Sequence, residues 1–470
     1  MPGATLTALS ATDVVKLVRS GEVTPVELVE ASLARIEAVD GGLNALPTVC
    51  AERALARAAE VAADAPLAGL PLAVKDLTDV AGVRTTYGSP IYADHVPDRS
   101  DLLVERLESQ GAVVVAKSNT PEFGAGGNTF NEVFGETRNP WDTARTCGGS
   151  SGGAAAALAS GQVWLATGSD LGGSLRTPAG FCGVVGLRPS PGRVASGPSE
   201  LPFGTLSVEG PMARSVADAA LMLDAMSGPH PADPLALEPP PVPYRQAAAQ
   251  PRLPARVAFS PDLGITPLEP AVRDACERAV AALEAAGVEV QRRHPDLSDA
   301  PAAFQVLRAA GFVADLEPLL AGDRARLKPD VVWNIEQGLA LTPSRLAWAE
   351  RARGLVAAEM AALFGEVELL LCPSACVVPF DVGQRWVREV DGVALDNYVE
   401  WLRICSAITL SACPVVALPC ALSDGGLPVG MQLVAPPRGE WRLIAAAAAI
   451  EQVFGVHQRV PMDPRSAVAG

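Results

Sequence analysis

The stretch TCGGSSGGAAAA, residues 146–157, places two serines between two glycine pairs and continues directly into alanines. A flexible linker would join independent pieces, but these glycines run straight into a helix-forming segment with strand-like sequence on either side. A phosphate-binding loop of the GxxxxGK[ST] type needs a lysine after its second glycine, and none follows here. The remaining interpretation is a serine that takes part in nucleophilic chemistry, which requires a base.

Histidine is a poor candidate for that base. The four histidines, His95, His230, His294 and His457, lie in loop-like or terminal sequence. None has a G-x-S-x-G nucleophile turn upstream. A triad of the Ser-His-Asp type is therefore disfavoured.

Lysine can act as a base when burial lowers its pKa, because a low dielectric favours the neutral amine. Lys75 ends the apolar, strand-like stretch LAGLPLAVKDL, residues 67–77. An unpaired ammonium would be costly at such a position. The alternative is an ion pair with the adjacent Asp76 or with another acid, and burial alone does not separate the two.

The second glycine-rich segment, GSDLGGSLRTP at residues 168–178, supplies a nucleophile. Ser174 follows two glycines and precedes a helix-forming segment, so its hydroxyl can lie at the start of a helix. The backbone N–H groups of Leu171, Gly172, Gly173 and Ser174 can converge as an oxyanion hole. Asp170 and Arg176 are expected to support this turn rather than to react.

Apolar strand-like runs alternate with helix-forming segments along most of the chain, which indicates an α/β protein. The segment AVVVAKSN, residues 112–119, has no polar alternation and predicts a strand buried on both faces of a parallel or mixed sheet. Residues 229–256 concentrate proline and predict a surface crossover.

Charge and composition limit the possible partners and compartments. The net charge of −16 disfavours binding to nucleic acid or to an anionic membrane. The most apolar stretch, Cys405 to Cys420, is short and contains two prolines, so it predicts no membrane span. The N-terminus lacks the pattern of a secretory signal. Nine widely spread cysteines fit reduced thiols in the cytoplasm, and no cofactor or metal is expected.

Motifs along nearly the whole chain resemble those of the amidase signature family. GLPLAVKD (69–76), GAVVVAKSNTPEF (111–123), TRNPWD (137–142), GGSSGG (148–153), the run from GSDLGGSLR to PSPGRV (168–194) and GPMARSVADAALML (210–223) occur in the family's order. The segment SACPVVALPCALSDGGLPVGMQLVAPP, residues 411–437, is similar to the family's closing segment.

The resemblance implies an α/β fold with a large mixed sheet covered by helices on both faces. It also implies a single domain over residues 1–470, with a signature core at about 65–228, the crossover at 229–256, and the rest of the same sheet at 257–470. The implied catalytic triad is Lys75, Ser150 and Ser174, with a cis peptide bond before Ser150. Ser151 is the rival of Ser150 for the bridging role.

The implied activity is hydrolysis of a small-molecule carboxylic amide, linear or aryl, through a serine acyl-enzyme, and the resemblance makes a homodimer plausible. Carbamates and esters are alternative substrates. A second hypothesis is the amide-transferring A-type subunit of a glutamyl-tRNA amidotransferase, which works only with partner chains. A third is a catalytically inactive scaffold, which the presence of all three triad residues disfavours.

Overall fold

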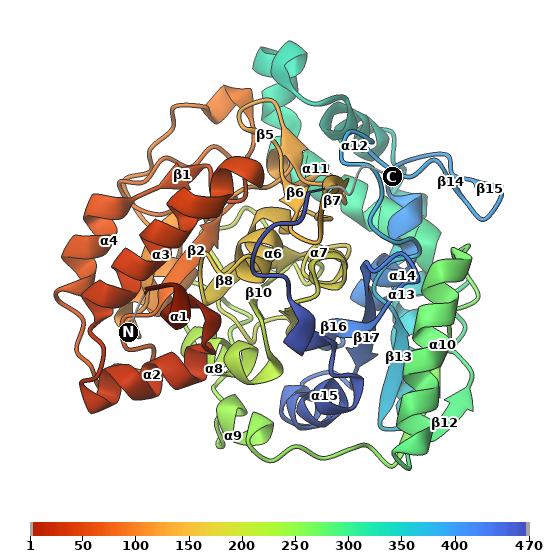
Figure 1. Ribbon diagram of the computed structural model, residues 1–470. Helices are drawn as coiled ribbons and strands as arrows, with labels where there is room; N and C mark the ends of the chain where they lie inside the picture. Colours follow the sequence, from red (N-terminus) through yellow and green to blue (C-terminus); the bar gives the residue numbers. More distant parts are fainter. Residues whose placement is uncertain (1–2, 467–470) are drawn as a thin grey trace.

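The computed structural model describes residues 3–466 and is built around one mixed sheet of eleven strands (Figure 1). Their order across the sheet is β1-β3-β2-β8-β10-β9-β16-β17-β13-β11-β12, so strands from both sides of residues 229–256 share it. The strands are β1 (Thr48–Val49), β2 (Pro71–Lys75), β3 (Val113–Ser118), β8 (Leu165–Asp170), β9 (Val185–Arg188), β10 (Val208–Ala213), β11 (Arg256–Phe259), β12 (Glu289–Arg292), β13 (Leu369–Pro373), β16 (Val415–Leu422) and β17 (Pro428–Val434). Three two-stranded ribbons add β4 (Phe130–Asn131), β5 (Gly135–Glu136), β6 (Arg138–Asn139), β7 (Asp142–Thr146), β14 (Glu389–Val390) and β15 (Val393–Ala394).

Helices cover both faces of this sheet, as expected. On one face α8, α10 and α15 pack side by side against β9, β10, β16 and β17, and on the other α3, α6 and α7 pack against the strands (Figure 1). Every residue of α6 and of α7 is buried, because these two helices lie within the core. The helices are α1 (Gly3–Ala8), α2 (Ala11–Ser20), α3 (Pro25–Val39), α4 (Ala51–Ala58), α5 (Leu102–Ser109), α6 (Gly152–Ala159), α7 (Arg176–Cys182), α8 (Val216–Met226), α9 (Tyr244–Ala248), α10 (Pro270–Ala285), α11 (Ala300–Asp323), α12 (Pro329–Leu339), α13 (Pro343–Phe364), α14 (Arg403–Thr409) and α15 (Glu440–Phe454).

Strand β2 occupies the part of the sheet that carries the candidate chemistry. It runs parallel to both of its neighbours, β3 and β8, while β10 runs antiparallel to β8. All six residues of β3 are buried, which confirms the prediction of a strand covered on both faces. Because β2 and β8 are parallel, their carboxyl ends lie at the same edge of the sheet, and this edge brings residues 75 and 170 together.

The helices α3 and α5 begin differently. The helix α3 begins after Thr24, and Thr24 and Glu27 form the reciprocal hydrogen bonds of a capping box. The N-cap residue of α5 is Asp101, whose side chain forms no capping hydrogen bond. The neighbouring Ser100 hydroxyl accepts a hydrogen bond from the backbone N–H of Ala81 at 2.9 Å.

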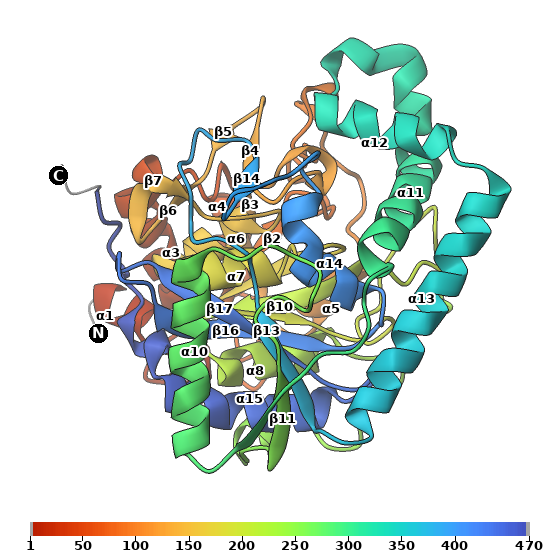
Figure 2. The ribbon, with the colours of Figure 1, turned by 90° about the vertical axis from the view of Figure 1, so that its right-hand side faces the viewer.

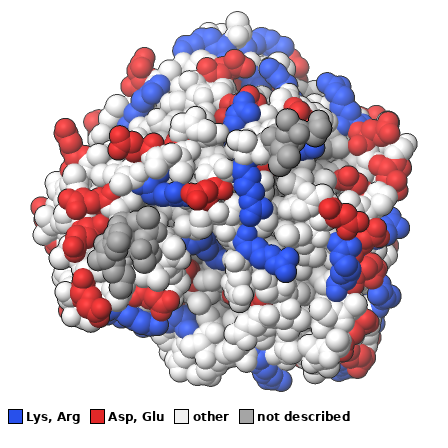
Figure 3. Space-filling view, in the orientation of Figure 1, with Lys and Arg blue, Asp and Glu red and all other residues white. Residues whose placement is uncertain are grey.

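The long helices α11, α12 and α13 stand together to one side of the sheet (Figure 2). On the face drawn in Figure 3, positive and negative side chains are interspersed, with wide uncharged areas between them. Within residues 3–466, no helix combines the length and the apolar character that crossing a bilayer requires.

Candidate active site

The Lys75 side chain, at the end of β2, is fully buried, and its Nζ meets only hydroxyl groups of the described residues at hydrogen-bond distance. Its Nζ lies 2.7 Å from Ser150 Oγ, 2.9 Å from Ser151 Oγ and 3.0 Å from Ser169 Oγ. A protonated lysine can donate to all three hydroxyls, whereas a neutral amine has a lone pair that accepts from one of them. The site is therefore suited to moving a proton between Lys75 and a serine.

The adjacent carboxylate does not neutralise this lysine. Asp76 points instead toward Lys117, with Oδ1 at 3.5 Å from Nζ, and accepts a hydrogen bond from the Thr86 hydroxyl at 2.5 Å. Within the described part of the chain, no ion pair joins Lys75 to any carboxylate. Of the two interpretations that burial left open, the ion pair with Asp76 is thus contradicted.

Burial lowers the pKa of Lys75 to about 7, although the Glu209 and Asp170 carboxylates act in the opposite direction. A lysine with a pKa in this range is neutral in a large fraction of molecules near neutral pH. It can therefore accept a proton, as general-base chemistry requires.

The Gly149–Ser150 peptide bond is cis, as the resemblance implied. It leads into α6, whose first residue is Gly152. Ser150 lines a cavity, whereas Ser151 is fully buried and is not among the residues that line that cavity. Only the first of the two serines thus touches both Lys75 and the space open to a ligand.

Ser174 lies in the turn between β8 and α7 and lines the same cavity as Ser150. Its backbone carbonyl accepts a hydrogen bond from the N–H of Ser151 at 3.2 Å. The two glycine-rich segments are therefore joined directly through the backbone, and each contributes one serine, Ser150 or Ser174, to the cavity lining.

The turn before Ser174 is held by Asp170. The Asp170 carboxylate accepts hydrogen bonds from the N–H groups of Gly173 at 3.0 Å and Leu175 at 3.1 Å. Gly173 has a φ of 118°, which favours glycine at this position. The Gly173 N–H, one of the four predicted oxyanion donors, is thus already hydrogen-bonded to Asp170. Leu171, Gly172 and Ser174, which line the cavity, are the other three candidates.

Two buried arginines hold Asp170 in turn. Arg176 donates from Nε at 2.9 Å and from Nη2 at 2.8 Å, and Arg188 lies within 3.3 Å. Burial by itself would raise the pKa of Asp170, but the positive charges of Arg176 and Arg188 outweigh it and hold that pKa well below its usual range. Asp170 is therefore a permanent anion that shapes the turn, which is consistent with the supporting role expected for it and for Arg176.

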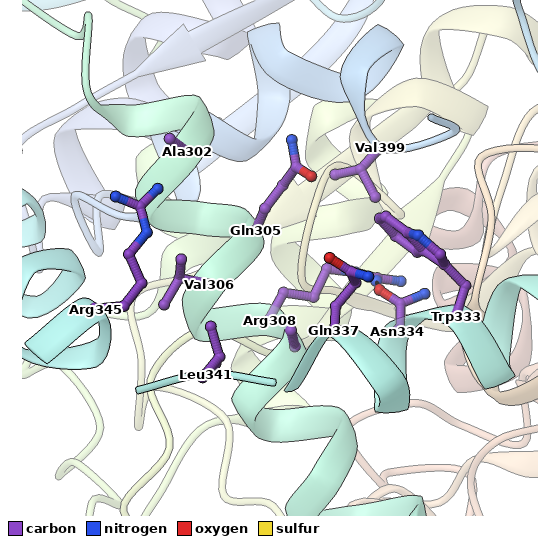
Figure 4. A pocket seen from close by; sticks show the side chains of 11 residues that line it. Ala302, Gln305, Val306, Arg308, Trp333, Asn334, Gln337, Leu341, Arg345 and Val399 are labelled. Atoms are coloured by element: carbon purple, nitrogen blue, oxygen red, sulfur yellow. Dashed lines mark hydrogen bonds between the residues drawn. The ribbon is translucent and has the colours of Figure 1, made fainter. Parts of the chain in front are cut away.

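The cavity has a volume of about 680 Å³ and lies between the sheet edge and the helices α11 and α13. None of the four histidines lines it, in agreement with the argument against a histidine triad. A smaller cavity of about 330 Å³ lies beside it between α11 and α12, and Arg308 and Val399 line both (Figure 4).

Sequence reasoning missed two groups of this site and one wall of the cavity. Ser169, the third hydroxyl on Lys75, was not singled out, and neither was Glu209, which lines the cavity from β10. The segment from Ser196 to Glu209 also forms part of the lining. The sequence offered only weak signals for these residues. Ser169 is one of several small polar residues in GSDLGGSLR, and Glu209 is a single acidic residue before Gly210.

Comparison with known proteins is consistent with this geometry. A sequence profile of the family described as Amidase matches residues 27–444. The chain is 32% identical to an acylamidase of Rhodococcus erythropolis, over 97% of each chain. It is 37% identical to the A-type subunit of the glutamyl-tRNA(Gln) amidotransferase of Thermus thermophilus, over 95% of this chain and 97% of that one. The crystal structure of a bacterial aryl acylamidase of the amidase signature family superposes with a TM-score of 0.90 at 27% identity, covering 97% of this chain and 98% of the other. The serine-lysine cluster, the mixed sheet and these matches agree, and the chain belongs to the amidase signature family of amide-hydrolysing enzymes.

Proposed function

We propose that this protein hydrolyses the C–N bond of a small carboxylic amide, linear or aryl, through a serine acyl-enzyme. Ser174 is the nucleophile, Ser150 relays the proton and Lys75 is the base. The observation that carries the proposal is the placement of Ser150, which is 2.7 Å from the buried Lys75 Nζ and lines the same cavity as Ser174.

In the first half of the reaction, neutral Lys75 takes a proton from Ser150 while Ser150 takes one from Ser174. The Ser174 Oγ then forms a bond to the amide carbon, and the carbonyl oxygen becomes an oxyanion. Backbone N–H groups of Leu171, Gly172 and Ser174 stabilise that charge, a contribution typically of about 10²–10³ in rate per donor.

When the tetrahedral intermediate collapses, the C–N bond breaks and the leaving nitrogen takes a proton from Ser150, which Lys75 replenishes. Water then attacks the ester of Ser174 with the same relay as base. The carboxylic acid leaves, and Ser174 recovers its proton. No net charge accumulates on the relay over one cycle, because each proton removed is returned.

The test is covalent labelling combined with turnover. A fluorophosphonate probe should label Ser174, and Ser174→Ala should abolish both labelling and hydrolysis of an activated anilide. Ser109→Ala, an exposed change on α5 whose hydroxyl contacts only the carbonyl of Arg106, is the matched control and should retain both. Labelling that persists in the Ser174 variant would refute the assignment of the nucleophile. A panel of amides, carbamates and esters would then rank the substrate classes.

A second candidate is an amide-transferring subunit that works only with partner chains, and the 37% identity to the Thermus protein favours it. In that case the purified chain would hydrolyse simple amides poorly, while glutamine hydrolysis would appear on adding partner subunits. Co-purification from the source cells, followed by a glutaminase assay with and without the co-purified chains, separates the two candidates. Turnover by the chain alone supports the free amidase.

A further inference from the structure

Glu209 lies beside the proposed catalytic cluster although the mechanism above does not use it. Strand β10 pairs antiparallel with β8, and Glu209 lies directly opposite Ser169. Residues directly opposite in an antiparallel pair project from the same face of the sheet. Ser169 Oγ contacts Lys75 Nζ at 3.0 Å, so Glu209 lies on the same face of the sheet as the hydroxyl that meets this lysine. Glu209 and Ser169 both line the cavity, together with Ser150.

The Glu209 carboxyl has an unused acceptor. Its Oε2 atom is buried and has no hydrogen-bond partner among the described residues. Leaving a buried acceptor without a hydrogen bond costs free energy, and it costs more when the group is charged. A group that occupies the cavity can remove that cost by donating a hydrogen bond.

The cationic side chains of the cavity wall are already engaged elsewhere. Arg308 donates to Asn334 and to the Tyr398 hydroxyl, and Figure 4 shows it directed along the smaller cavity beside Asn334. Arg353 donates to the Thr205 hydroxyl and to the carbonyl of Leu410. Neither arginine forms an ion pair with Glu209 within the described chain.

The charges around Glu209 make this end of the cavity negative once the carboxyl ionises. Burial raises the pKa of Glu209 to about 7, with Lys75 opposing the shift and Asp101 adding to it. Asp101 lines the same cavity, whereas the charge of Asp170 is already offset by Arg176 and Arg188. A positive charge that enters the cavity would therefore favour the ionised carboxylate and gain a charge-assisted hydrogen bond from it.

We propose that Glu209 is a specificity-determining residue that binds an ammonium group of the substrate, so that the enzyme prefers amides carrying a positive charge near the scissile bond. This inference rests on the proposed amide hydrolysis and names its substrate class. It concerns binding alone and adds no covalent step.

The experiment compares matched substrate pairs in the wild type and in Glu209→Gln. One set contains 4-nitroanilides of ω-amino acids of increasing chain length, each paired with the neutral alkanoyl anilide that has a methyl in place of the ammonium. A second set places the ammonium on the amine side, with mono-acetylated diaminoalkanes paired with N-alkylacetamides. We expect the wild type to prefer the charged member by about 10-fold or more in kcat/KM at one chain length, as one charge-assisted hydrogen bond allows. In Glu209→Gln the ratio should fall to near unity.

Glu350→Gln is the matched control, because it removes another carboxylate of the same cavity, one whose charge is offset by Arg353. It should keep most of the preference. An equal ratio in the wild type and in Glu209→Gln, or no preference in the wild type, overturns the inference. A Glu209→Gln variant that shifts the pH profile but not the ratio also overturns it, because Glu209 would then act only through Lys75.

A binding measurement separates this inference from the proposed reaction. Calorimetry with n-butylammonium and with n-butanol reports on the subsite without turnover. The ammonium should bind the wild type more tightly than the alcohol, and Glu209→Gln should lose the difference. If neutral amides are hydrolysed while neither assay discriminates charge, the inference fails and the reaction stands. If no amide is hydrolysed but the ammonium still binds through Glu209, the reaction fails and the subsite stands.

Discussion

Two lysines on neighbouring strands, Lys75 on β2 and Lys117 on β3, are both 0% exposed, yet their surroundings differ. The parallel register pairs Lys75 with Ser118 and Val74 with Lys117, so the two side chains leave opposite faces of the sheet. Lys117 donates to the carbonyl of Thr78 at 2.6 Å and to the Thr85 hydroxyl at 2.7 Å, and it pairs with Asp76. Among residues 3–466, Lys75 meets three serine hydroxyls and no carboxylate at hydrogen-bond distance.

Burial alone therefore does not make a lysine a general base. Burial lowers the pKa of both lysines, and for Lys117 the nearby Asp76 and Asp79 oppose that shift. A lysine that is held by a carboxylate and a carbonyl is a structural donor. A lysine whose hydrogen-bond partners are hydroxyls can lose its proton without breaking a direct ion pair, and one of its hydroxyl partners can pass a proton on.

The largest expected effect separates the two lysines. Lys75→Met should lower kcat/KM by about 10²–10⁴, the usual contribution of a general base, with a smaller loss of stability than Lys117→Met because no carboxylate of the described residues lies at ion-pair distance from Lys75. Lys117→Met should strand Asp76 and lower the free energy of unfolding by about 3–5 kcal/mol. Steady-state kinetics and urea unfolding of both variants measure the two effects.

The double variant Lys117→Met/Asp76→Asn controls for misfolding, since removing both charges should recover part of the lost stability. Comparable losses of activity and of stability in the two single variants would contradict the distinction between a catalytic and a structural lysine. Both lysines would then have a structural role only.

The second prediction concerns pH. Because the base must be neutral, kcat/KM should rise with pH through a midpoint near 7, the value to which burial lowers the pKa of Lys75. Two units below that midpoint the activity should fall by about 100-fold. The unfolded chain keeps the lysine proton to higher pH, so this residue makes stability increase with pH above about 7. A kcat/KM profile checks the first statement, and a flat profile between pH 5 and 8 would contradict it.

A third prediction tests the support of the turn. Arg176→Lys keeps the positive charge but loses the planar guanidinium group, which donates hydrogen bonds to Asp170, to the carbonyl of Cys405 and to other buried acceptors. We expect stability to fall by about 3 kcal/mol and kcat to fall by about 10-fold, with KM less affected. Urea unfolding and steady-state kinetics measure both. Full activity at reduced stability would limit Arg176 to a role in folding.

Much of the fold and the central residues of the site could be predicted from the sequence. Apolar runs predicted β2 and β3, and the glycine-rich segments predicted the positions of Ser150 and Ser174. The sequence did not reveal the partner of Asp76, because only the sheet register decides that Lys117 faces it. The same holds for Glu209, whose position depends on the pairing of β10 with β8, although α7 and β9 lie between these two strands in the sequence. The single-domain organisation over residues 1–470 stays a prediction.

The smallest expected effect concerns the choice between the two adjacent serines on Lys75, Ser150 and Ser151. Ser150 and Ser151 are neighbours in sequence and both contact Nζ, but only Ser150 lines the cavity. If Ser150 relays the proton, Ser151→Ala should lower kcat only about 2- to 5-fold, through the loss of one hydrogen bond that orients the lysine. Ser150→Ala should cost at least about 10²-fold. Equal losses in the two variants would mean that the two hydroxyls act as one network and that contact with the cavity does not select the relay.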